Sequence, residues 1–547
     1  MSENTVPPCM KRKFVWACLL WIAIQLPFAS GAFRIDEPYH LKAAQHLQTS
    51  PADPYGFYIN WNGTPEWAFR TYASPPLMPE WLALWSRIFP WNEFSLHVGM
   101  LPFSVVALLA FGLLAGSYGL DTRVAMALLA CSPAFFLTSQ VAMPDIAMLS
   151  FFLVAVTGAR LYQLNGRTAA LLVAGIAAFC CPLAKYNGIV IVPVLICIAL
   201  VRPRRAVMIY IAMVPLLSLI LFGGFTWLRY GAVHFLAMSS YQRSAEMSTH
   251  PAVITVGVFA ATGIGVLPLS LLLFLVRGHK QSRFVIAVDT LSLIGSVWLG
   301  LRFGYPPISI VLFAASIGLA THLICLALEQ GWKRLRGSEW DWLALSVWIL
   351  AGFAFQYGVM FTATRYLLFL APPAILLAMR ITTRPPQGAI LGLVLAANLI
   401  LTVSIAVGDL LASNIYRDVT SHELKAVLED DKRRTYFAGH WGFQYYAERH
   451  GGELIDKRKS PQFQPGDSVL IAKMPWPSLL QPATGRLAFE RRSLLLNRSW
   501  PIRTLSCEAG ILFHGNAISG CVRPTLLPFG ISAEPWEEFL VYQMKNP

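Results

Sequence analysis

The chain has 547 residues, of which 13% are charged and 56% are hydrophobic, and its formal net charge is +14. Soluble domains carry about a quarter of their residues as charged side chains, so this composition excludes an ordinary soluble protein. Most of the positive excess lies in short segments between apolar runs. It therefore indicates membrane topology, and nucleic acid is not expected as a partner.

Apolar stretches recur from residue 14 to residue 411, and each is long enough for a hydrocarbon core about 30 Å thick. The first follows a basic segment as in a signal peptide, but no clear small-residue cleavage site follows it, so we predict an uncleaved span. We predict thirteen spans, at residues 14–33, 97–117, 123–141, 145–163, 168–184, 187–201, 206–228, 251–276, 284–301, 307–328, 341–361, 366–379 and 388–411. The span at 366–379 is short for a full crossing.

The distribution of Lys and Arg predicts the orientation. With a cytoplasmic N-terminus, nearly every cytoplasmic segment is rich in basic residues: Lys11, Arg12, Lys13, Arg123, Arg160, Arg167, Arg202, Arg204, Arg205, Arg277, Lys280, Arg283, Lys333, Arg334, Arg336, Arg380 and Arg384. This bias fits the positive-inside rule and an odd number of crossings. It places the loop 34–96 and the tail from residue 412 outside the cytoplasm, in a multi-pass protein of the plasma (bacterial inner) membrane.

The first long loop, 34–96, has the composition of helices that lie in the membrane interface. It contains Trp61, Trp67, Trp81, Trp85 and Trp91, with Pro75-Pro76 between two helix-like stretches. Trp-rich amphipathic helices favour the interface plane. The alternative is a solvated loop with scattered aromatic residues.

The chain changes character at about residue 414, where charge rises and hydrophobic runs shorten. Turn signals and short β-like runs such as residues 467–472 predict a small α/β domain at 414–547, outside a transmembrane domain at 1–413. This domain contains Cys507 and Cys521, which form a disulfide bond in our interpretation if the compartment is oxidising; two free buried thiols are the alternative.

Two acidic positions on the same predicted face are candidates for a chemical role, because a charged side chain at membrane depth is energetically costly and is usually functional. Asp36 and Glu37 follow the first span and lead into an aromatic residue and an imidazole. A plain interfacial charge is the alternative for this pair. Asp145 follows Pro144 in a tight turn between two apolar runs, where it is a candidate for a helix cap, for a functional acid, or for both.

Basic and aromatic residues on that face are candidates for binding an anion. Lys185 lies between two spans, where a lysine that extends to the interface is the common alternative. Arg365 precedes Tyr366 on the side that is otherwise poor in basic residues, and arginine suits phosphate. Weaker candidates on the same face are His40, Tyr186, Arg243, His250 and Arg302.

Two acids and two cations on one membrane face suit the transfer of a sugar from a lipid phosphate. One carboxylate accepts the proton of the attacking hydroxyl. The cations stabilise the charge that grows on the departing phosphate. No His, Cys and carboxylate cluster has ligand spacing for a metal, and the sequence leaves open the use of a divalent ion by the acids.

These positions resemble the glycosyltransferases of the GT-C superfold. Within that superfold the chain is similar to the dolichyl-phosphate-mannose protein mannosyltransferases (glycosyltransferase family 39) and to their bacterial relatives, which include the aminoarabinose transferase that modifies lipid A. The resemblance is carried by Asp36-Glu37, Ser74-Pro75-Pro76-Leu77, Met143-Pro144-Asp145, Ala184-Lys185-Tyr186, Arg365-Tyr366-Leu367-Leu368 and the tail segment 438–446.

The resemblance implies a polyprenyl-phosphate-linked monosaccharide as donor and inversion at the anomeric carbon, without direct use of a nucleotide sugar. It implies an extracytoplasmic acceptor, which is lipid A, a protein or a glycan. By position it makes Asp36 the catalytic base, Asp145 the second site acid, and Lys185 and Arg365 the phosphate-side cations. One departure concerns the residue before Pro75, which is often Lys or His in relatives and is Ser74 here; it leaves the sugar and the acceptor open.

Two other functions compete with this one. A transporter or flippase of lipid-linked sugars would explain the spans and the intramembrane charges, but it does not readily explain acids on a Trp-rich loop or a sizeable tail. A carbohydrate-binding tail on a membrane anchor would need far fewer spans.

Overall fold

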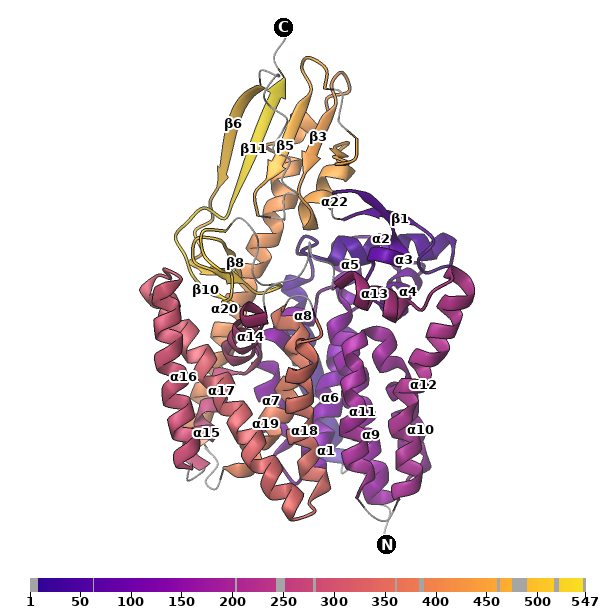
Figure 1. Ribbon diagram of the computed structural model, residues 1–547, viewed down its shortest axis with the longest axis vertical. Coiled ribbons are helices and arrows are strands. Elements are labelled where there is room, and N and C mark those ends of the chain that lie inside the picture. Colours follow the sequence, from indigo (N-terminus) through magenta and orange to yellow (C-terminus); the bar gives the residue numbers. More distant parts are fainter. Residues whose placement is uncertain are drawn as a thin grey trace.

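The computed structural model describes residues 8–61, 63–201, 204–242, 251–278, 282–359, 362–382, 388–459, 463–474, 489–515 and 521–544. Most of the described chain forms a bundle of long helices, and a small β-rich domain stands on one end of it (Figure 1). The N-terminal helix α1 (Pro8–Gln25) begins at the opposite end of the bundle. The structure thus has the expected helical multi-pass architecture with a small C-terminal mixed-sheet domain.

The described helices supply fewer clear crossings than the thirteen predicted. Seven stretches are long and apolar enough to cross a membrane: Glu93–Ser117, Pro144–Asn165, Ala206–Tyr230, Arg283–Arg302, Pro307–Arg336, Thr364–Ile381 and Gly388–Ser421. The pair Pro251–Val266 and Leu269–Leu275 gives an eighth if it is one span, although it bends by 85°. Among the described residues, the thirteen crossings are therefore not confirmed.

The missing crossings have physical explanations. Four predicted spans coincide with apolar helices that are shorter than a full crossing: Val15–Phe28, Thr168–Ala184, Tyr186–Ala199 and Trp342–Gln356. The predicted span 123–141 is divided into α7 (Thr122–Ala130) and α8 (Pro133–Thr138). Ser132 caps the N-terminus of α8 with its hydroxyl, and Pro133 cannot continue α7, so the helix restarts there.

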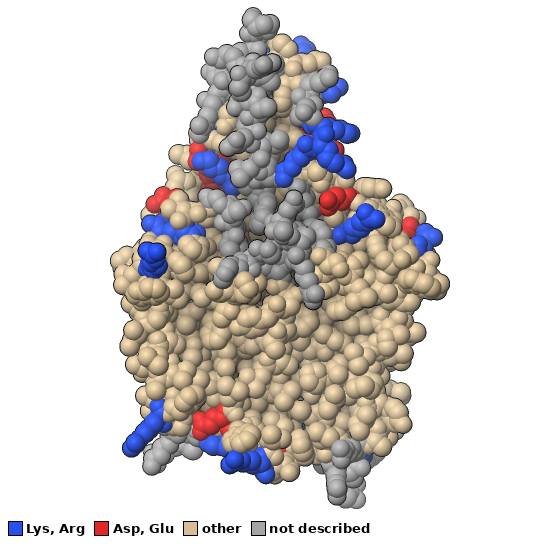
Figure 2. Space-filling model, viewed as in Figure 1, with Lys and Arg blue, Asp and Glu red and all other residues tan. Residues whose placement is uncertain are grey.

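The bundle helices have a wide lipid-compatible surface. On the face shown in Figure 2, Lys, Arg, Asp and Glu gather toward the two ends, and the middle of the bundle is uncharged. The bundle consists of α6 (Leu101–Ser117), α7, α8, α9 (Pro144–Asn165), α10 (Thr168–Ala184), α11 (Ile191–Ala199), α12 (Arg205–Tyr230), α14 (Pro251–Ala260), α15 (Leu272–Gly278), α16 (Arg283–Arg302), α17 (Pro307–Arg336), α18 (Trp340–Gln356), α19 (Ala371–Ile381), α20 (Gly388–Ser421) and α1.

The first long loop lies across the end of the bundle that carries the β-rich domain (Figure 1). Its helices are α2 (Glu37–Thr49), α3 (Ala68–Thr71), α4 (Leu77–Trp85) and α5 (Glu93–Val98), and α5 leads into α6. A hairpin of β1 (Tyr58–Asn60) and β2 (Pro65–Trp67), which the sequence did not predict, follows α2. The short helix α13 (His234–Gln242) packs beside α3.

The C-terminal domain contains a five-stranded mixed sheet in the order β4-β3-β5-β11-β6. Its strands are β3 (Thr435–Ala438), β4 (Glu453–Leu454), β5 (Ser468–Ala472), β6 (Phe489–Leu496) and β11 (Glu537–Met544). Strand β3 pairs in parallel with β4 and β5, whereas β11 is antiparallel to β5 and β6. The predicted β-like run 467–472 thus corresponds to β5, which lies at the centre of the sheet.

Helix α20 connects the bundle with the sheet. It runs without a break from Gly388 to Ser421, so the predicted division at 413/414 falls inside a helix. Two short ribbons, β7 (Ile502–Arg503) with β10 (Gly530–Ile531) and β8 (Leu505–Ser506) with β9 (Ile511–Leu512), lie between the sheet and the bundle. At Gly408 a Cβ atom would lie 2.4 Å from the Ile502 carbonyl oxygen, so a glycine there permits close contact of β7 with α20.

Candidate active site

Four predicted charged residues meet at the end of the bundle beneath the first loop. Asp36 directly precedes α2, Asp145 is in the first turn of α9, Lys185 directly follows α10, and Arg365 is in the 3-10 helix η5 (Thr364–Leu370). Each residue is therefore placed by an element boundary, where the chain leaves one helix or begins the next. We call Asp36, Asp145, Lys185 and Arg365 the charge cluster.

The charge cluster is held together by alternating ion pairs. Arg365 Nη2 donates to Asp36 Oδ2, and Arg365 Nε lies 3.8 Å from Asp145 Oδ2. Lys185 Nζ lies 2.5 Å from Asp145 Oδ1. The order is thus Asp36, Arg365, Asp145 and Lys185, with opposite charges adjacent throughout.

Neither acid in the charge cluster caps a helix with its side chain. Asp36 is the N-cap residue of α2 but makes no side-chain cap hydrogen bond, and Met143, rather than Asp145, is the N-cap residue of α9. Lys185 does not extend into solvent, because it pairs with Asp145 and has 15% of its side chain exposed. The structure therefore contradicts two alternatives. Asp145 is not the cap of α9, and Lys185 is not a lysine that extends to the interface.

The charge cluster has a reachable pair and a buried pair. The side chain of Asp36 is 24% exposed and that of Lys185 15% exposed, whereas those of Asp145 and Arg365 are 1% and 3% exposed. A ligand that approaches from outside meets one carboxylate and one ammonium group first. The buried Asp145 and Arg365 hold these two groups in place.

Aromatic side chains adjoin the charge cluster. Lys185 Nζ lies 3.6 Å from the centre of the Tyr366 ring, a cation–π contact, and Arg365 Cζ lies 5.1 Å from it. The Tyr186 hydroxyl lies 2.5 Å from His234 Nδ1. His40 Nδ1 lies 2.6 Å from the Tyr72 hydroxyl. Burial lowers the pKa of His40 to about 4, against the opposing attraction of Asp36, so this imidazole is neutral at physiological pH.

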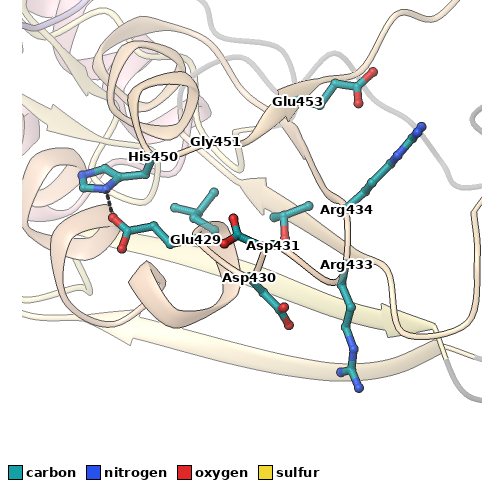
Figure 3. Close-up of a pocket in the computed structure, with 10 residues that line it drawn as sticks. Glu429, Asp430, Asp431, Arg433, Arg434, His450, Gly451 and Glu453 are labelled. Atoms are coloured by element: carbon teal, nitrogen blue, oxygen red, sulfur yellow. Dashed lines mark hydrogen bonds and ion pairs between the residues drawn. The ribbon is translucent and has the colours of Figure 1, made fainter.

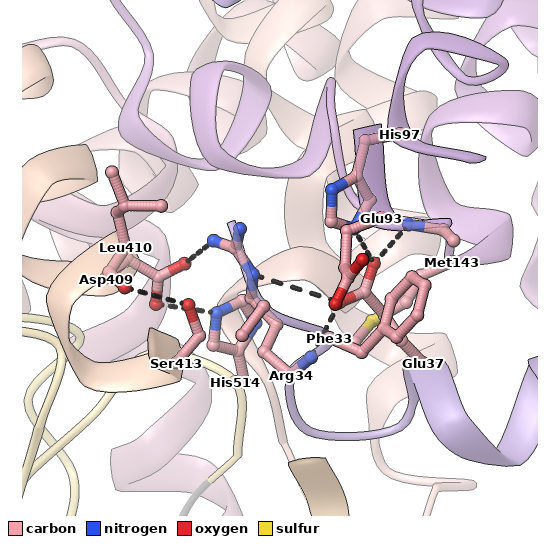
Figure 4. A network of polar contacts seen from close by, with 12 residues as sticks. Phe33, Arg34, Glu37, Glu93, His97, Met143, Asp409, Leu410, Ser413 and His514 are labelled. Carbon is pink, nitrogen blue, oxygen red and sulfur yellow. Dashed lines mark hydrogen bonds and ion pairs between the residues drawn. The ribbon is translucent and has the colours of Figure 1, made fainter. Parts of the chain in front are cut away.

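Glu37 belongs to a different network from its neighbour Asp36 (Figure 4). Its Oε1 lies 2.8 Å from His97 Nε2 and accepts from the Ala142 N–H at 2.6 Å, and its Oε2 accepts from the Arg34 N–H at 2.7 Å. The Glu37 side chain has no exposed surface. These contacts make Glu37 a structural anchor, whereas Asp36 is the reachable acid.

The Glu37 network continues to α20 and to the C-terminal domain. Arg34 Nη1 donates to Asp409 Oδ2, and Asp409 Oδ1 lies 3.0 Å from His514 Nε2 (Figure 4). We call Arg34, Glu37, His97, Asp409 and His514 the buried network. Sequence reasoning did not include Arg34, His97, Asp409 or His514. Asp409 carried a usable signal, because it is an acid within a predicted span.

The remaining predicted residues lie elsewhere. Arg302 is exposed at the end of α16, at the margin of the bundle, and is not part of the charge cluster. Arg243 and His250 lie outside the described residues. Ser74 offers its carbonyl oxygen to the Tyr55 hydroxyl at 2.9 Å. Cys507 and Cys521 are joined by a disulfide bond.

The C-terminal domain has a pocket of about 360 Å³ next to β3 (Figure 3). Charged residues of both signs line it, including Glu429, Asp430, Arg433 and His450. His450 Nδ1 lies 2.8 Å from Glu429 Oε1, and the side chain of Glu429 is 44% exposed. These are features of a solvated surface, so the pocket is not a second candidate site. Within the described ranges, no group of three or more His, Cys, Asp or Glu residues could hold a metal ion.

A scan of known protein families and a search of curated proteins give no match to this sequence. Among solved structures, the chain is similar to ArnT from Cupriavidus metallidurans in the apo state, at 11% identity, over 98% of this chain and 99% of that chain, with a TM-score of 0.49. The same protein bound to undecaprenyl phosphate matches at 11% identity over 90% and 96%, with a TM-score of 0.47.

A second similar structure is the oligosaccharyltransferase of Archaeoglobus fulgidus in complex with Zn and sulfate. It matches at 13% identity over 81% of this chain and 62% of that chain, with a TM-score of 0.42. Because these TM-scores are below 0.5, the function must be argued from the geometry of the charge cluster.

Proposed function

We propose that this protein is a membrane glycosyltransferase of the family 39 type, which moves a hexose or pentose from a polyprenyl phosphate to an extracytoplasmic acceptor with inversion. The observation that carries the proposal is the charge cluster, in which a reachable carboxylate and a reachable ammonium group are each held by a buried counter-ion. This arrangement provides a base and an anion site within one small region. The fold supports it because that region lies at one end of the helical bundle, beneath the first loop.

The proposed reaction is a single displacement at the anomeric carbon. The acceptor hydroxyl oxygen attacks this carbon from the face opposite the phosphate, and its proton passes to an oxygen of Asp36. The bond between the anomeric carbon and the phosphate oxygen breaks, and its electron pair stays on the polyprenyl phosphate. Asp36 acts as general base, and phosphate leaves without a general acid because it is already a stable anion.

The cations have two roles in this reaction. Lys185 and Arg365 stabilise the second negative charge that the phosphate gains as the bond breaks. A donor phosphate also competes with Asp36 for the Arg365 guanidinium. Donor binding thereby frees the Asp36 carboxylate to accept a proton, so the base becomes available only when the donor is present.

A lipid-linked donor suits the position of the charge cluster. An isoprenoid chain remains in the hydrocarbon layer while its phosphate lies at the interface, where helix ends bring Lys185 and Arg365 together. With the orientation predicted from Lys and Arg, this is the extracytoplasmic face. The acceptor is then lipid A, a protein or a glycan on that face.

Replacement of the base tests the proposal. In purified full-length protein supplied with polyprenyl-phosphate sugars, Asp36→Asn should lower the transfer rate roughly 10²- to 10⁴-fold, because general-base catalysis has that size. The matched control is Asp121→Asn, since Asp121 caps α7 at an exposed site and Asn caps as well as Asp. Full transfer by Asp36→Asn would eliminate Asp36 as the base.

A transport assay separates the enzyme from a flippase. Vesicles that contain the wild-type protein should release free polyprenyl phosphate as the sugar appears on an acceptor, as shown by mass spectrometry of the lipid fraction. If the vesicles move intact lipid-linked sugar across the bilayer and release no polyprenyl phosphate, the protein is a transporter.

A further inference from the structure

Asp409 connects the C-terminal domain to the loop that carries Asp36. Its Oδ2 accepts from the Arg34 guanidinium, and Arg34 lies two residues before Asp36 (Figure 4). Its Oδ1 accepts from the Thr504 hydroxyl at 2.9 Å and lies 3.0 Å from His514 Nε2. Both residues come from the C-terminal domain, so this single carboxylate joins the two parts of the chain.

The same C-terminal segment also contacts the neighbour of Arg365. The N–H of Thr364 donates to the carbonyl oxygen of Phe513 at 3.1 Å. The Phe513 N–H in turn donates to the Thr504 carbonyl oxygen at 2.9 Å, so residues 504–514 form one folded unit. Phe513 therefore contacts the residue before Arg365 directly, whereas His514 is linked to the arm that presents Asp36 through Asp409 and Arg34.

The backbone between Arg34 and Asp36 is held in an unfavourable conformation. Ile35 has a φ of 45°, in the left-handed region that β-branched residues avoid. Such a conformation persists only where the surroundings impose it. Here the anchors are Arg34, fixed by Asp409 and by the Glu37 side chain, and Asp36, fixed by Arg365.

We propose that the 504–514 segment, acting through His514 and Asp409, is a positioning element that keeps Asp36 within the charge cluster, so that the C-terminal domain completes the active site. The inference rests on the proposed function, in which Asp36 is the base. If Arg34 loses the charge of Asp409, Ile35 relaxes to an ordinary φ and Asp36 moves away from the cluster. Asp409 and His514 touch no reacting atom and act only through Arg34.

The experiment compares two aspartates of α20 in the full-length protein. Asp409→Asn should lower kcat roughly 10- to 100-fold, because small misplacements of a reacting group have effects of this size, and it should leave the KM for the lipid donor unchanged. The control is Asp418→Asn, because Asp418 also pairs with a C-terminal residue, Arg498 at 2.7 Å, but at an exposed site. Asp418→Asn should keep the wild-type kcat.

Three further variants distinguish positioning from folding. His514→Gln keeps a donor for Asp409 and should keep most of kcat, whereas His514→Phe keeps a ring without a donor and should lose it. Adding Ile35→Gly to Asp409→Asn should restore part of kcat, because glycine adopts a positive φ without strain. A purely structural role for Asp409 predicts no such restoration.

Chemical labelling of Asp36 gives a readout that does not depend on transfer. Carbodiimide-activated amine labelling, followed by peptide mass mapping, should modify Asp36 several-fold faster in Asp409→Asn than in wild type or Asp418→Asn. Wild-type protein without transferase activity would defeat the proposed function, while faster Asp36 labelling would still support the positioning contact. The inference would be overturned if Asp409→Asn showed the labelling rate and the kcat of the wild type. It would also be overturned if the loss of kcat in Asp409→Asn were no larger than the loss of folded protein.

Discussion

The charge cluster and the buried network are both built from acidic and basic side chains, but they differ in access. In the charge cluster, Asp36 and Lys185 are partly exposed. In the buried network, Glu37 and His97 have no exposed side-chain surface, and both oxygens of Glu37 accept hydrogen bonds. Fully buried ion pairs hold a structure together, whereas a reachable ion pair can exchange its partner for a substrate.

The comparison is sharpest at Asp36 and Glu37, which are adjacent in sequence. The turn at Ile35 and the start of α2 direct one carboxylate toward Arg365 and the other toward His97. The two adjacent acids therefore belong to different contact networks. Each acid finds a different cation, and the two networks meet only through the backbone.

The largest effect is expected in the charge cluster. Lys185→Met keeps most of the apolar stem of the side chain but removes the reachable ammonium group, so kcat should fall roughly 10²- to 10³-fold, as for other losses of transition-state charge stabilisation. Steady-state transfer from a polyprenyl-phosphate sugar measures this change. The control is Lys42→Met, because Lys42 pairs with Glu448 on the same face outside the cluster. Equal losses in both variants would refute a specific role for Lys185.

A smaller effect, on stability, is expected in the buried network. Glu37→Gln leaves Arg34 and His97 without their carboxylate, so the free energy of unfolding should fall by about 3 kcal/mol, as for other broken buried ion pairs. Denaturant titration in detergent measures the change, and kcat per folded molecule should fall less than in Lys185→Met. Glu448→Gln is the control, since its exposed pair with Lys42 is worth less than about 1 kcal/mol. An unchanged stability of Glu37→Gln would contradict the structural role.

The smallest effect concerns Glu537, a buried acid that has no cationic side chain among its described contacts. Glu537 in β11 accepts from the Tyr416 hydroxyl and from the backbone N–H groups of Lys473, Met474 and Glu538. Burial raises the pKa of Glu537 to about 7, whereas at Glu37 the attraction of His97 and Arg34 outweighs burial and lowers the pKa. The comparison of Glu37 with Glu537 thus shows that a neighbouring positive charge lowers the pKa of a buried carboxylate that burial alone would raise.

A raised pKa in the folded state means that folding favours the protonated form of Glu537. The stability that Glu537 provides is complete below its ordinary pKa and is lost as the pH rises through about 7. The free energy of unfolding of the C-terminal domain should fall by up to about 1.4 kcal/mol per pH unit across this window. Glu537→Gln should remove this slope. Identical pH profiles in the variant and in wild type would show that another group is responsible.

The positions of the helices were predictable because apolar runs of about 20 residues are typical of membrane-spanning helices and rare in other structures. The number of crossings was not, because Pro133 divides one run and other helices are too short to cross alone. The hairpin of β1 and β2 was missed because strands of three residues carry too little alternation. Short elements are fixed by the surface on which they pack rather than by their own sequence.

The sequence and a family resemblance suggested Asp36, Asp145, Lys185 and Arg365, and the structure places these four side chains together. Their roles remain predictions that the variants test. The pairing could not be foreseen, because it depends on the convergence of four element boundaries that are far apart in the sequence. Asp409 was overlooked because it is a single acid within a long apolar segment. His514 was overlooked because its partner, Asp409, is more than 100 residues away along the chain.

Helix α20 also limits how the chain can vary. With 34 residues it is about 51 Å long, so it exceeds a hydrocarbon core of about 30 Å by several turns. The orientation of the sheet about the α20 axis is therefore fixed relative to the membrane end of the helix. A single residue inserted into α20 would rotate the sheet by about 100° relative to the bundle. A flexible linker would absorb such a change, but a continuous helix transmits it. The length of α20 beyond Asp409 is thus constrained in addition to the identity of Asp409.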